Sequence, residues 1–156
     1  MLQRDEFTRA AKRYGDMIYR LALTYTKNPP EAEDIAQEVL IRLYLAKKDF
    51  QSDDHLRFWL VRVTQNECRK KYRRKNERTV SLDEISELAE ASEEDRGVIS
   101  AVMGLDRKYR QVILLYYYEE YSIDEISALT RIPKGTVGTR LRRAREILKR
   151  KLEDNG

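Results

Sequence analysis

The stretch YSIDEISALTRIPKGTVGTRLRRAREILKRKL, residues 121–152, decides the fold of the C-terminal half. Its first ten residues are typical of a short helix, in which Ser122 is the N-cap and Glu125 completes a capping box. The segment 131–133 reads as a turn, and a long basic helix follows over 134–152. A short helix, a tight turn and a longer helix form a helix-turn-helix, whose second helix enters the major groove of DNA.

The second of these helices has an apolar side and a polar side. Its apolar residues recur at spacings of three and four, so we expect one buried edge made of Val137, Leu141, Ala144, Leu148 and Leu152. The outward side carries Arg, Thr and Lys, which contact bases or phosphates. These candidates are Lys134, Thr136, Thr139, Arg140 and Arg143. The alternative is an ordinary amphipathic surface helix.

Helical periodicity also dominates the N-terminal half. It predicts a helix that ends before Asn28, a second over about 30–46 with Asn28 as its cap, and a third over about 55–75. The second helix offers Ile35, Val39, Leu40 and Leu43 to a core, and turns Asp34, Gln37, Glu38 and Ile41 to the other side. No strand pattern competes, so the predicted fold class is all-α.

Charge divides the chain, whose formal net charge is +4, into blocks. Residues 57–78 carry nine Lys or Arg against two acids, and residues 131–151 carry nine against one. Between them, residues 81–95 carry seven acids and no base. Two basic blocks separated by an acidic one suggest two contacts with a polyanion. We expect two small helical domains, at 1–76 and 98–156, joined by a flexible acidic linker at 77–97 with one weak helical turn around 82–91.

Several classes of function find no support in the composition. One Cys and one His leave no disulfide and no zinc-ligand set, so neither a metal nor another cofactor is expected. No apolar run is long enough to cross a bilayer, and the first residues lack the apolar core of a signal peptide. We therefore expect a cytoplasmic protein without direct membrane insertion.

The third helix combines an apolar side with a polar stripe. Arg62, Asn66, Arg69 and Arg73 follow one another at spacings of four, three and four. An uncharged Asn adds little to solubility, but it can hydrogen-bond an exposed base of single-stranded nucleic acid. The alternative is that Asn66 caps or crosslinks helices internally. For Trp59, packing in the core is favoured over stacking on a base.

Three segments together resemble a bacterial RNA polymerase sigma factor of the small, extracytoplasmic-function (ECF) type. EAEDIAQEVLIRLY (31–44) is similar to region 2.2 of that family, and FWLVRVTQNECRKKYRR (58–74) to regions 2.3–2.4. Residues 105–152, with their Ile-Pro-x-Gly-Thr-Val turn, resemble region 4. The resemblance covers nearly all of the chain outside the linker, and the motifs follow in the family's order.

The resemblance implies partners and assigns residues to them. The first domain would bind core RNA polymerase through its second helix, and would read and hold open the minus-ten promoter element. The second domain would read the minus-thirty-five element through the outward residues of the long helix, from Lys134 to Arg143. A cognate anti-sigma factor is a further implied partner, while no enzyme activity and no small-molecule substrate are implied. The residues of the first domain are Asp34, Gln37, Glu38 and Ile41 for polymerase; Arg62, Asn66, Arg69, Lys70, Arg73 and Arg74 for minus-ten DNA; and Gln51, Ser52, Asp53 and Asp54 for the loop that receives a flipped base.

Three features depart from the family pattern. Gly138 stands where many relatives carry Lys or Arg, so minus-thirty-five specificity does not simply carry over. Tyr116 replaces a frequent basic residue, and Asp53 and Asp54 make the flipped-base loop more acidic than expected beside DNA.

Two other classes of protein compete with this interpretation. A free-standing helix-turn-helix regulator explains the C-terminal half equally well but gives the basic stripe of the third helix no role. A nuclease would need an acidic cluster for a metal beside the basic face, and the acids at 31–38 have no such arrangement.

Overall fold

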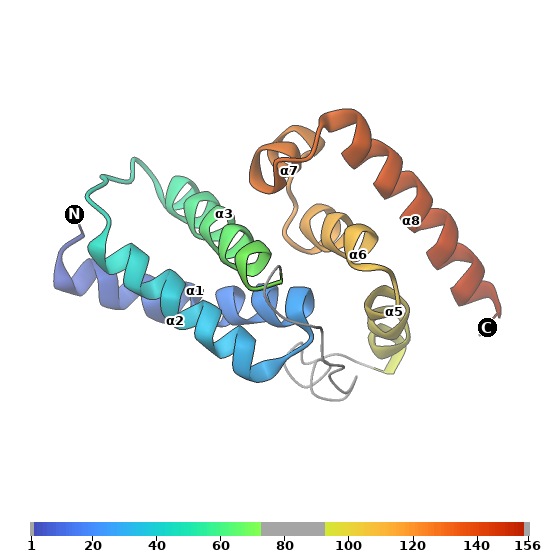
Figure 1. The fold of residues 1–156 in the computed structure, drawn as a ribbon, viewed down its shortest axis with the longest axis horizontal. Helices are drawn as coiled ribbons and strands as arrows, with labels where there is room; N and C mark the ends of the chain where they lie inside the picture. Colours follow the sequence, from blue (N-terminus) through green and yellow to red (C-terminus); the bar gives the residue numbers. More distant parts are fainter. Residues whose placement is uncertain (1, 73–92, 155–156) are drawn as a thin grey trace. The chain divides into compact units, whose positions relative to one another are not determined.

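The structure is a computed structural model that describes residues 2–72 and 93–154 (Figure 1). These residues form helices joined by short connections and contain no strand, so the predicted all-α class is confirmed. The chain divides into two compact units, Met1–Val80 (unit 1) and Ser81–Gly156 (unit 2).

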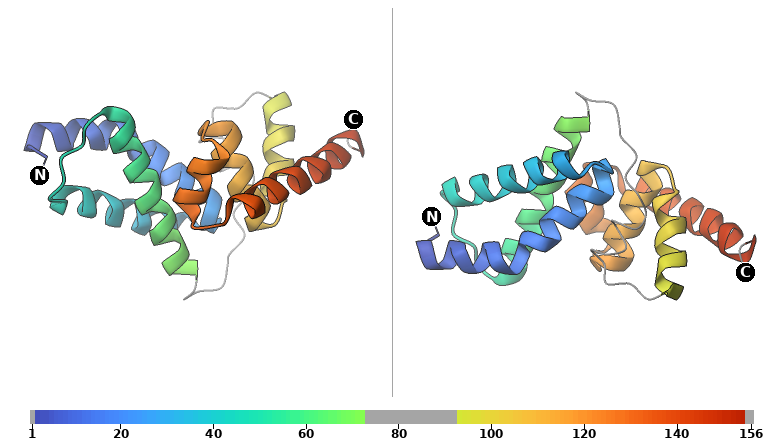
Figure 2. Two further views of the ribbon diagram at one scale, coloured as in Figure 1. Left: turned by 90° about the horizontal axis from the view of Figure 1, so that it is seen from above. Right: turned by 90° about the horizontal axis from the view of Figure 1, so that it is seen from below.

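The described part of unit 1 consists of three helices: α1 (Arg4–Thr26), α2 (Pro29–Leu45) and α3 (Asp53–Tyr72). Each of them packs against the other two, and α1 and α2 lie side by side (Figure 2). The predicted cap between α1 and α2 is present, because the Asn28 side chain accepts a hydrogen bond from the backbone N–H of Glu31 at 3.1 Å. This cap satisfies a backbone donor at the start of a helix that has no partner within the helix.

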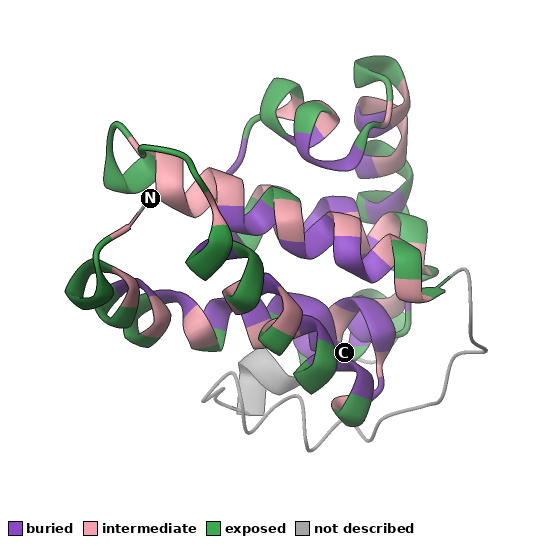
Figure 3. Cartoon of the chain, turned by 60° about the vertical axis from the view of Figure 1, so that its left-hand side comes forward, coloured by how far each residue is buried: buried purple, intermediate pink, exposed green. Residues whose placement is uncertain are grey.

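The core of unit 1 follows the predicted apolar sides. Ile35, Val39 and Leu43 of α2 are fully buried, whereas Leu40 is only half-buried. In α3, Leu60, Val61 and Cys68 are fully buried, while Phe58, Trp59 and Val63 line the margin of the core. Figure 3 shows this as buried stripes along one side of each helix. Full burial of one such aliphatic side chain stabilises the fold by about 1.5–3 kcal/mol.

Unit 2 contains α5 (Glu93–Met103), α6 (Arg107–Ile113), η1 (Leu114–Tyr118), α7 (Ile123–Thr130) and α8 (Lys134–Asp154). One boundary differs from the sequence prediction: residues 93–97, assigned to the linker, belong to α5. After α6, the helix changes to a π-helical turn at Leu114, where the backbone N–H of Glu119 donates to the carbonyl of Leu114 at 3.1 Å.

The helix-turn-helix of unit 2 is formed by α7 and α8, as predicted. Ser122 and Glu125 make both bonds of the capping box, at 3.1 and 3.0 Å. Arg131 ends α7 with a left-handed φ of 61°. The Ser127 hydroxyl donates to the carbonyl of Ile132 at 2.6 Å and so fixes the turn from inside.

The buried edge of α8 is shorter than predicted. Val137, Leu141 and Ala144 are fully buried, but Leu148 is only half-buried and Leu152 is 40% exposed. The prediction is therefore wrong for the last two residues. The helix extends past the part covered by α6 and α7, and α5 covers its C-terminal turns incompletely (Figure 1).

Some predicted features lie outside the described residues. They are the weak helical turn at 82–91, the linker up to residue 92, and two of the residues assigned to minus-ten DNA, Arg73 and Arg74. Among the helices that are described, none combines the length and the apolar character that crossing a bilayer needs.

Gly138 in α8 generates a prediction about stability. Its φ is not positive, and a Cβ added there would meet no atom within 4 Å. Gly in a helix interior costs about 1 kcal/mol relative to Ala. Gly138→Ala should therefore raise the free energy of unfolding by about 1 kcal/mol, measured by urea denaturation of the full chain.

A comparison for this substitution is Gly104→Ala, at the residue that follows the end of α5. A Cβ at Gly104 would lie 3.1 Å from the Lys151 Nζ and 3.4 Å from the carbonyl oxygen of Ser100. This variant should gain less stability than Gly138→Ala, and an unchanged free energy of unfolding for Gly138→Ala would contradict the argument.

Candidate nucleic-acid interface

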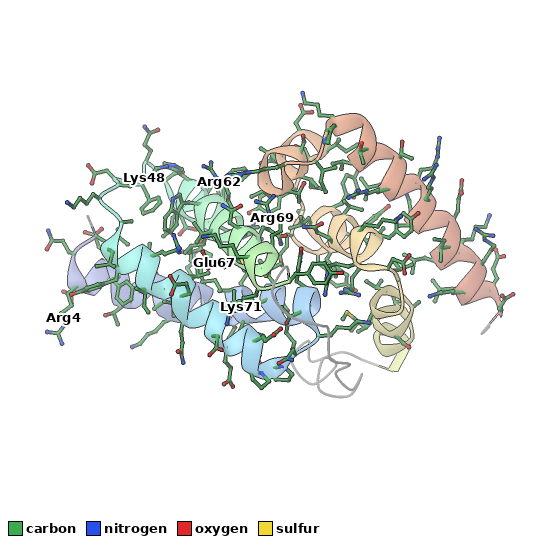
Figure 4. All side chains as sticks on the ribbon, viewed as in Figure 1. Arg4, Lys48, Arg62, Glu67, Arg69 and Lys71 are labelled. Atoms are coloured by element: carbon green, nitrogen blue, oxygen red, sulfur yellow. The ribbon has the colours of Figure 1, made fainter. Side chains whose placement is uncertain are left out.

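Helix α3 presents its polar stripe on the side opposite its buried residues. Arg62 is exposed, and Asn66 and Arg69 are half-buried. The Asn66 carbonyl oxygen accepts a hydrogen bond from the Arg69 guanidinium. Figure 4 shows Arg62 and Arg69 on the side of α3 away from α2. The Asn66 amide nitrogen, and the second lone pair of its carbonyl oxygen, are the groups with which it can bond a base while Arg69 stays in place.

A nearly buried carboxylate, Glu67, lies on the side of α3 that faces α2 (Figure 4). Its side chain is 10% exposed, and its Oε1 lies 3.0 Å from Arg42 of α2 and 3.2 Å from Lys70. Arg42 also pairs with Glu38 at 3.3 Å. A buried carboxylate is costly unless it is paired, so this cluster ties α2 to α3. The sequence analysis missed Glu67 and Arg42; the only available signal was the spacing of four between Glu38 and Arg42.

A second ion pair joins the same two helices. The Lys71 ammonium lies 3.2 Å from the Asp34 carboxylate, whose side chain is 61% exposed. An exposed pair of this kind contributes about 0–1 kcal/mol. Asp34 and Glu38, both assigned to polymerase, thus also have partners inside unit 1.

The outward face of α2 is more apolar than predicted. Asp34, Gln37 and Ile41 are exposed and Glu38 is half-exposed, so all four assigned residues lie on the accessible side of the helix. Two further exposed apolar residues follow Ile41, which is 51% exposed, towards the end of the helix: Tyr44 and Leu45. The sequence analysis did not select these two, although they continue the stripe by one turn.

The segment assigned to a flipped base is held at both ends. Ser52 caps α3 by accepting a hydrogen bond from the backbone N–H of His55 at 3.1 Å, and the His55 Nδ1 accepts from the N–H of Gln51 at 3.1 Å. Asp53 and Asp54 form the first turn of α3, not part of the preceding loop. The role in base binding stays a prediction, and the structure gives Gln51 and Ser52 a second role in starting the helix.

Asp53 anchors the start of α3 to α1. Its carboxylate accepts a hydrogen bond of 2.5 Å from the Tyr14 hydroxyl and lies 3.2 Å from the Arg13 guanidinium. Burial of Tyr14, with the hydrogen bond and the negative charge of Asp53, raises the pKa of this phenol to about 12. The negative charge of Asp53, which was unexpected beside DNA, is therefore compensated by Arg13 and the Tyr14 hydroxyl of α1.

Trp59 packs against Phe50. Their ring centroids are 5.4 Å apart in an edge-to-face contact, and Phe50 makes a similar contact with His55 at 5.4 Å. Trp59 is half-buried. The packing favoured from the sequence is present at the margin of the core.

In unit 2, four of the five residues predicted on the outward side of α8 border one open groove of about 490 Å³: Thr136, Thr139, Arg140 and Arg143. The fifth, Lys134, does not border it and pairs with Asp124 of α7 at 3.2 Å. The other wall of the groove comes from α6, with Lys108 and Tyr109, which the sequence analysis did not select. Gly138 leaves open space beside this helix.

Comparison with known proteins assigns both units. Residues 10–78 match the family described as Sigma-70 region 2, and residues 96–148 match Sigma-70, region 4. The ECF RNA polymerase sigma factor SigW of Bacillus subtilis is 34% identical over 169 aligned residues, which cover 96% of this chain and 90% of SigW. The chain belongs to the family of ECF RNA polymerase sigma factors. The resemblance noted in the sequence is thereby confirmed.

Two solved structures have a similar fold. CnrH, solved in complex with the cytosolic domain of CnrY, has a TM-score of 0.69 and 25% identity, and the match covers 99% of this chain and 92% of CnrH. The sigma factor RpoE, solved with the anti-sigma factor NepR from Bartonella quintana, has a TM-score of 0.71 and 19% identity. That match covers 94% of this sigma factor and 96% of RpoE, and it shows similarity of fold alone.

The Tyr14–Asp53 hydrogen bond predicts a pH dependence of stability. The folded state keeps the Tyr14 phenol protonated up to about pH 12, whereas an unfolded tyrosine ionises near pH 10. The folded state thus binds more protons between these values, and stability falls as pH rises from about 10 to 12. In urea denaturation, Tyr14→Phe should be less stable than the wild type at neutral pH, and the difference should shrink across this window.

Asp53→Asn serves as the companion variant. It removes the charge that helps to hold the proton on Tyr14, so the loss of stability with rising pH should be shallower than in the wild type. If both variants lose stability between about pH 10 and 12 as steeply as the wild type does, the loss of stability at alkaline pH comes from groups other than Tyr14.

Proposed function

We propose that this chain is an alternative sigma factor that directs core RNA polymerase to specific promoters and initiates transcription there. Unit 1 binds polymerase and reads and melts the minus-ten element, and unit 2 reads the minus-thirty-five element. One observation carries the proposal: each unit has a helix, α3 or α8, with an apolar edge in the core and an opposite basic, hydrogen-bonding stripe. Similarity to SigW along 96% of the chain supports this division.

This function is favoured over a free-standing helix-turn-helix regulator. Such a regulator would use α7 and α8 but would give unit 1 a sensing or dimerisation role. The match of residues 10–78 to Sigma-70 region 2 instead assigns unit 1 to the same activity as unit 2. The protein acts by binding polymerase and DNA, not by catalysis, and needs no cofactor.

For the minus-ten element, the half-buried Asn66 reads an unpaired base and the exposed Arg62 supports it from one turn earlier. Arg69 and Lys70 bind phosphates, as do Arg73 and Arg74 in the segment that follows the described helix. Removing a base from its stack costs a few kcal/mol, so a pocket that accepts only the right base converts melting into specificity. The segment Gln51–Asp54 receives that base in this proposal.

For core polymerase, the accessible side of α2 is the contact surface. Asp34, Gln37, Glu38 and Ile41 carry it, and the exposed Tyr44 and Leu45 extend it by one apolar turn. Exposed apolar side chains next to one another are typical of protein-binding surfaces. A cognate anti-sigma factor is the second protein partner, since RpoE was solved in complex with one. A sigma factor acts where core polymerase and promoter DNA are found, so this proposal includes a cytoplasmic location for the chain.

The base-reading role of Asn66 has a direct test. Asn66→Ala removes the amide while α3 keeps its buried edge, so transcription from the cognate promoter should fall about tenfold, the equivalent of about 1.4 kcal/mol for one lost hydrogen bond. Binding to core polymerase should stay unchanged in a pull-down. In vitro transcription over a genomic promoter library supplies the promoter.

Arg73→Ala is the comparison for this test, because it removes a proposed phosphate contact to the minus-ten element and leaves the pairs of Glu67 with Arg42 and Lys70 in place. It should weaken transcription without changing the preferred base. If Asn66→Ala abolishes polymerase binding or unfolds unit 1, its role is structural and not base reading.

The polymerase surface is tested best at residues without ion-pair partners inside unit 1. Charge reversal at Asp34 or Glu38 would also break the pairs with Lys71 and Arg42, so Ile41→Asp is the sharper change. Ile41 is 51% exposed, so the fold should persist by circular dichroism while core polymerase is no longer retained in a pull-down. Leu152→Asp, at a comparably exposed leucine of α8, should leave retention intact, and retention of Ile41→Asp would refute this surface.

A further inference from the structure

The groove beside α8 has a second wall that no promoter contact assigned above uses. Lys108 and Tyr109 of α6 border the same groove as Thr139, Arg140 and Arg143 of α8. About thirty residues separate the two walls in the sequence, and the packing of α6 against α8 brings them together.

The groove has the charge of an anion site. Its lining includes Lys108, Arg140 and Arg143 and no acidic residue. Lys108 is exposed, and its Nζ lies 5.1 Å from the centre of the Tyr109 ring. A cation over an aromatic face is attracted to it, so the ring holds the ammonium at the edge of the groove.

The occupant that fits this groove is the sugar-phosphate backbone of duplex DNA. Each strand carries one phosphate per 3.4 Å along the axis, so the strands that border a major groove bring phosphates to both sides of an inserted helix. Lys is a point charge suited to phosphate and carries no base preference of its own. The groove is also open, as a continuous strand requires, and does not enclose a small ligand.

We propose that Lys108 binds a backbone phosphate of the duplex whose bases α8 reads, so that α6 and α8 hold one strand between them. This inference rests on the proposed reading of the minus-thirty-five element by unit 2. Lys108 is then a positioning residue: it fixes the register of α8 on the duplex and adds affinity that does not depend on sequence.

The test measures binding of the holoenzyme, core polymerase with the full chain, to promoter duplex over a range of KCl concentrations. Lys108→Ala should weaken binding several-fold at moderate salt, equally for promoters with altered minus-thirty-five bases. Log affinity falls as log salt rises, and in Lys108→Ala this fall should be shallower, with the magnitude of its slope smaller by about one. The reason is that one phosphate contact releases about one counterion. Lys108→Arg keeps the charge and should keep both properties.

Lys149→Ala is the matched control, since Lys149 is an exposed lysine of α8 that lies beyond Arg143, the last residue of this helix to border the groove. It should leave the affinity and the salt slope unchanged. An unchanged slope for Lys108→Ala, or a loss confined to one base position, would overturn the proposal.

Arg140→Ala separates this inference from the function on which it rests. If Arg140→Ala changes discrimination at one minus-thirty-five position by the equivalent of about 1–3 kcal/mol while Lys108→Ala changes nothing, only the role of Lys108 fails. If neither variant alters binding of a promoter that the wild-type holoenzyme recognises, then duplex reading by unit 2 fails as well.

Discussion

The burial of one apolar edge sets the rotation of each helix that faces nucleic acid, and the candidate site depends on that rotation. In α3, Leu60 and Val61 are fully buried, and in α8 Val137 and Leu141 are. A helix advances 100° per residue, so once these side chains are fixed in a core the opposite stripe must face outward. Burial of the apolar edge is therefore enough to expose the polar residues to a ligand.

Ion pairs between α2 and α3 hold these two helices, and the surfaces they present, together. The Glu67 side chain is nearly buried in unit 1, and its negative charge is compensated by Arg42 of α2 and Lys70 of α3. Replacing one member of such a cluster leaves an uncompensated charge, so the cluster holds α2 and α3 in one relative position. The surface proposed for polymerase and the stripe proposed for minus-ten DNA thus lie on two helices that this cluster joins.

The carboxylate of Asp53 at the start of α3 is likewise compensated by partners within unit 1. Asp53 was unexpected beside DNA, yet its carboxylate is taken up by the Tyr14 hydroxyl and the Arg13 guanidinium of α1. Its interactions with α1 fix the beginning of α3 and the position of Gln51 and Ser52, which precede that helix. A residue that looks like part of a binding loop in the sequence therefore also has a structural role.

The sequence by itself determined most of the helices, the caps at Asn28 and Ser122, and the outward sides of α2, α3 and the first half of α8. These features depend on residues within one or two helical turns of each other, and the capping box of Ser122 shows how local the signal is. Only the tertiary structure decided that Glu67 meets Arg42, that Asp53 meets Tyr14, and that α6 supplies a wall of the groove along α8. Such contacts join side chains far apart in the chain, and they depend on how the helices pack, which no periodicity within one helix records.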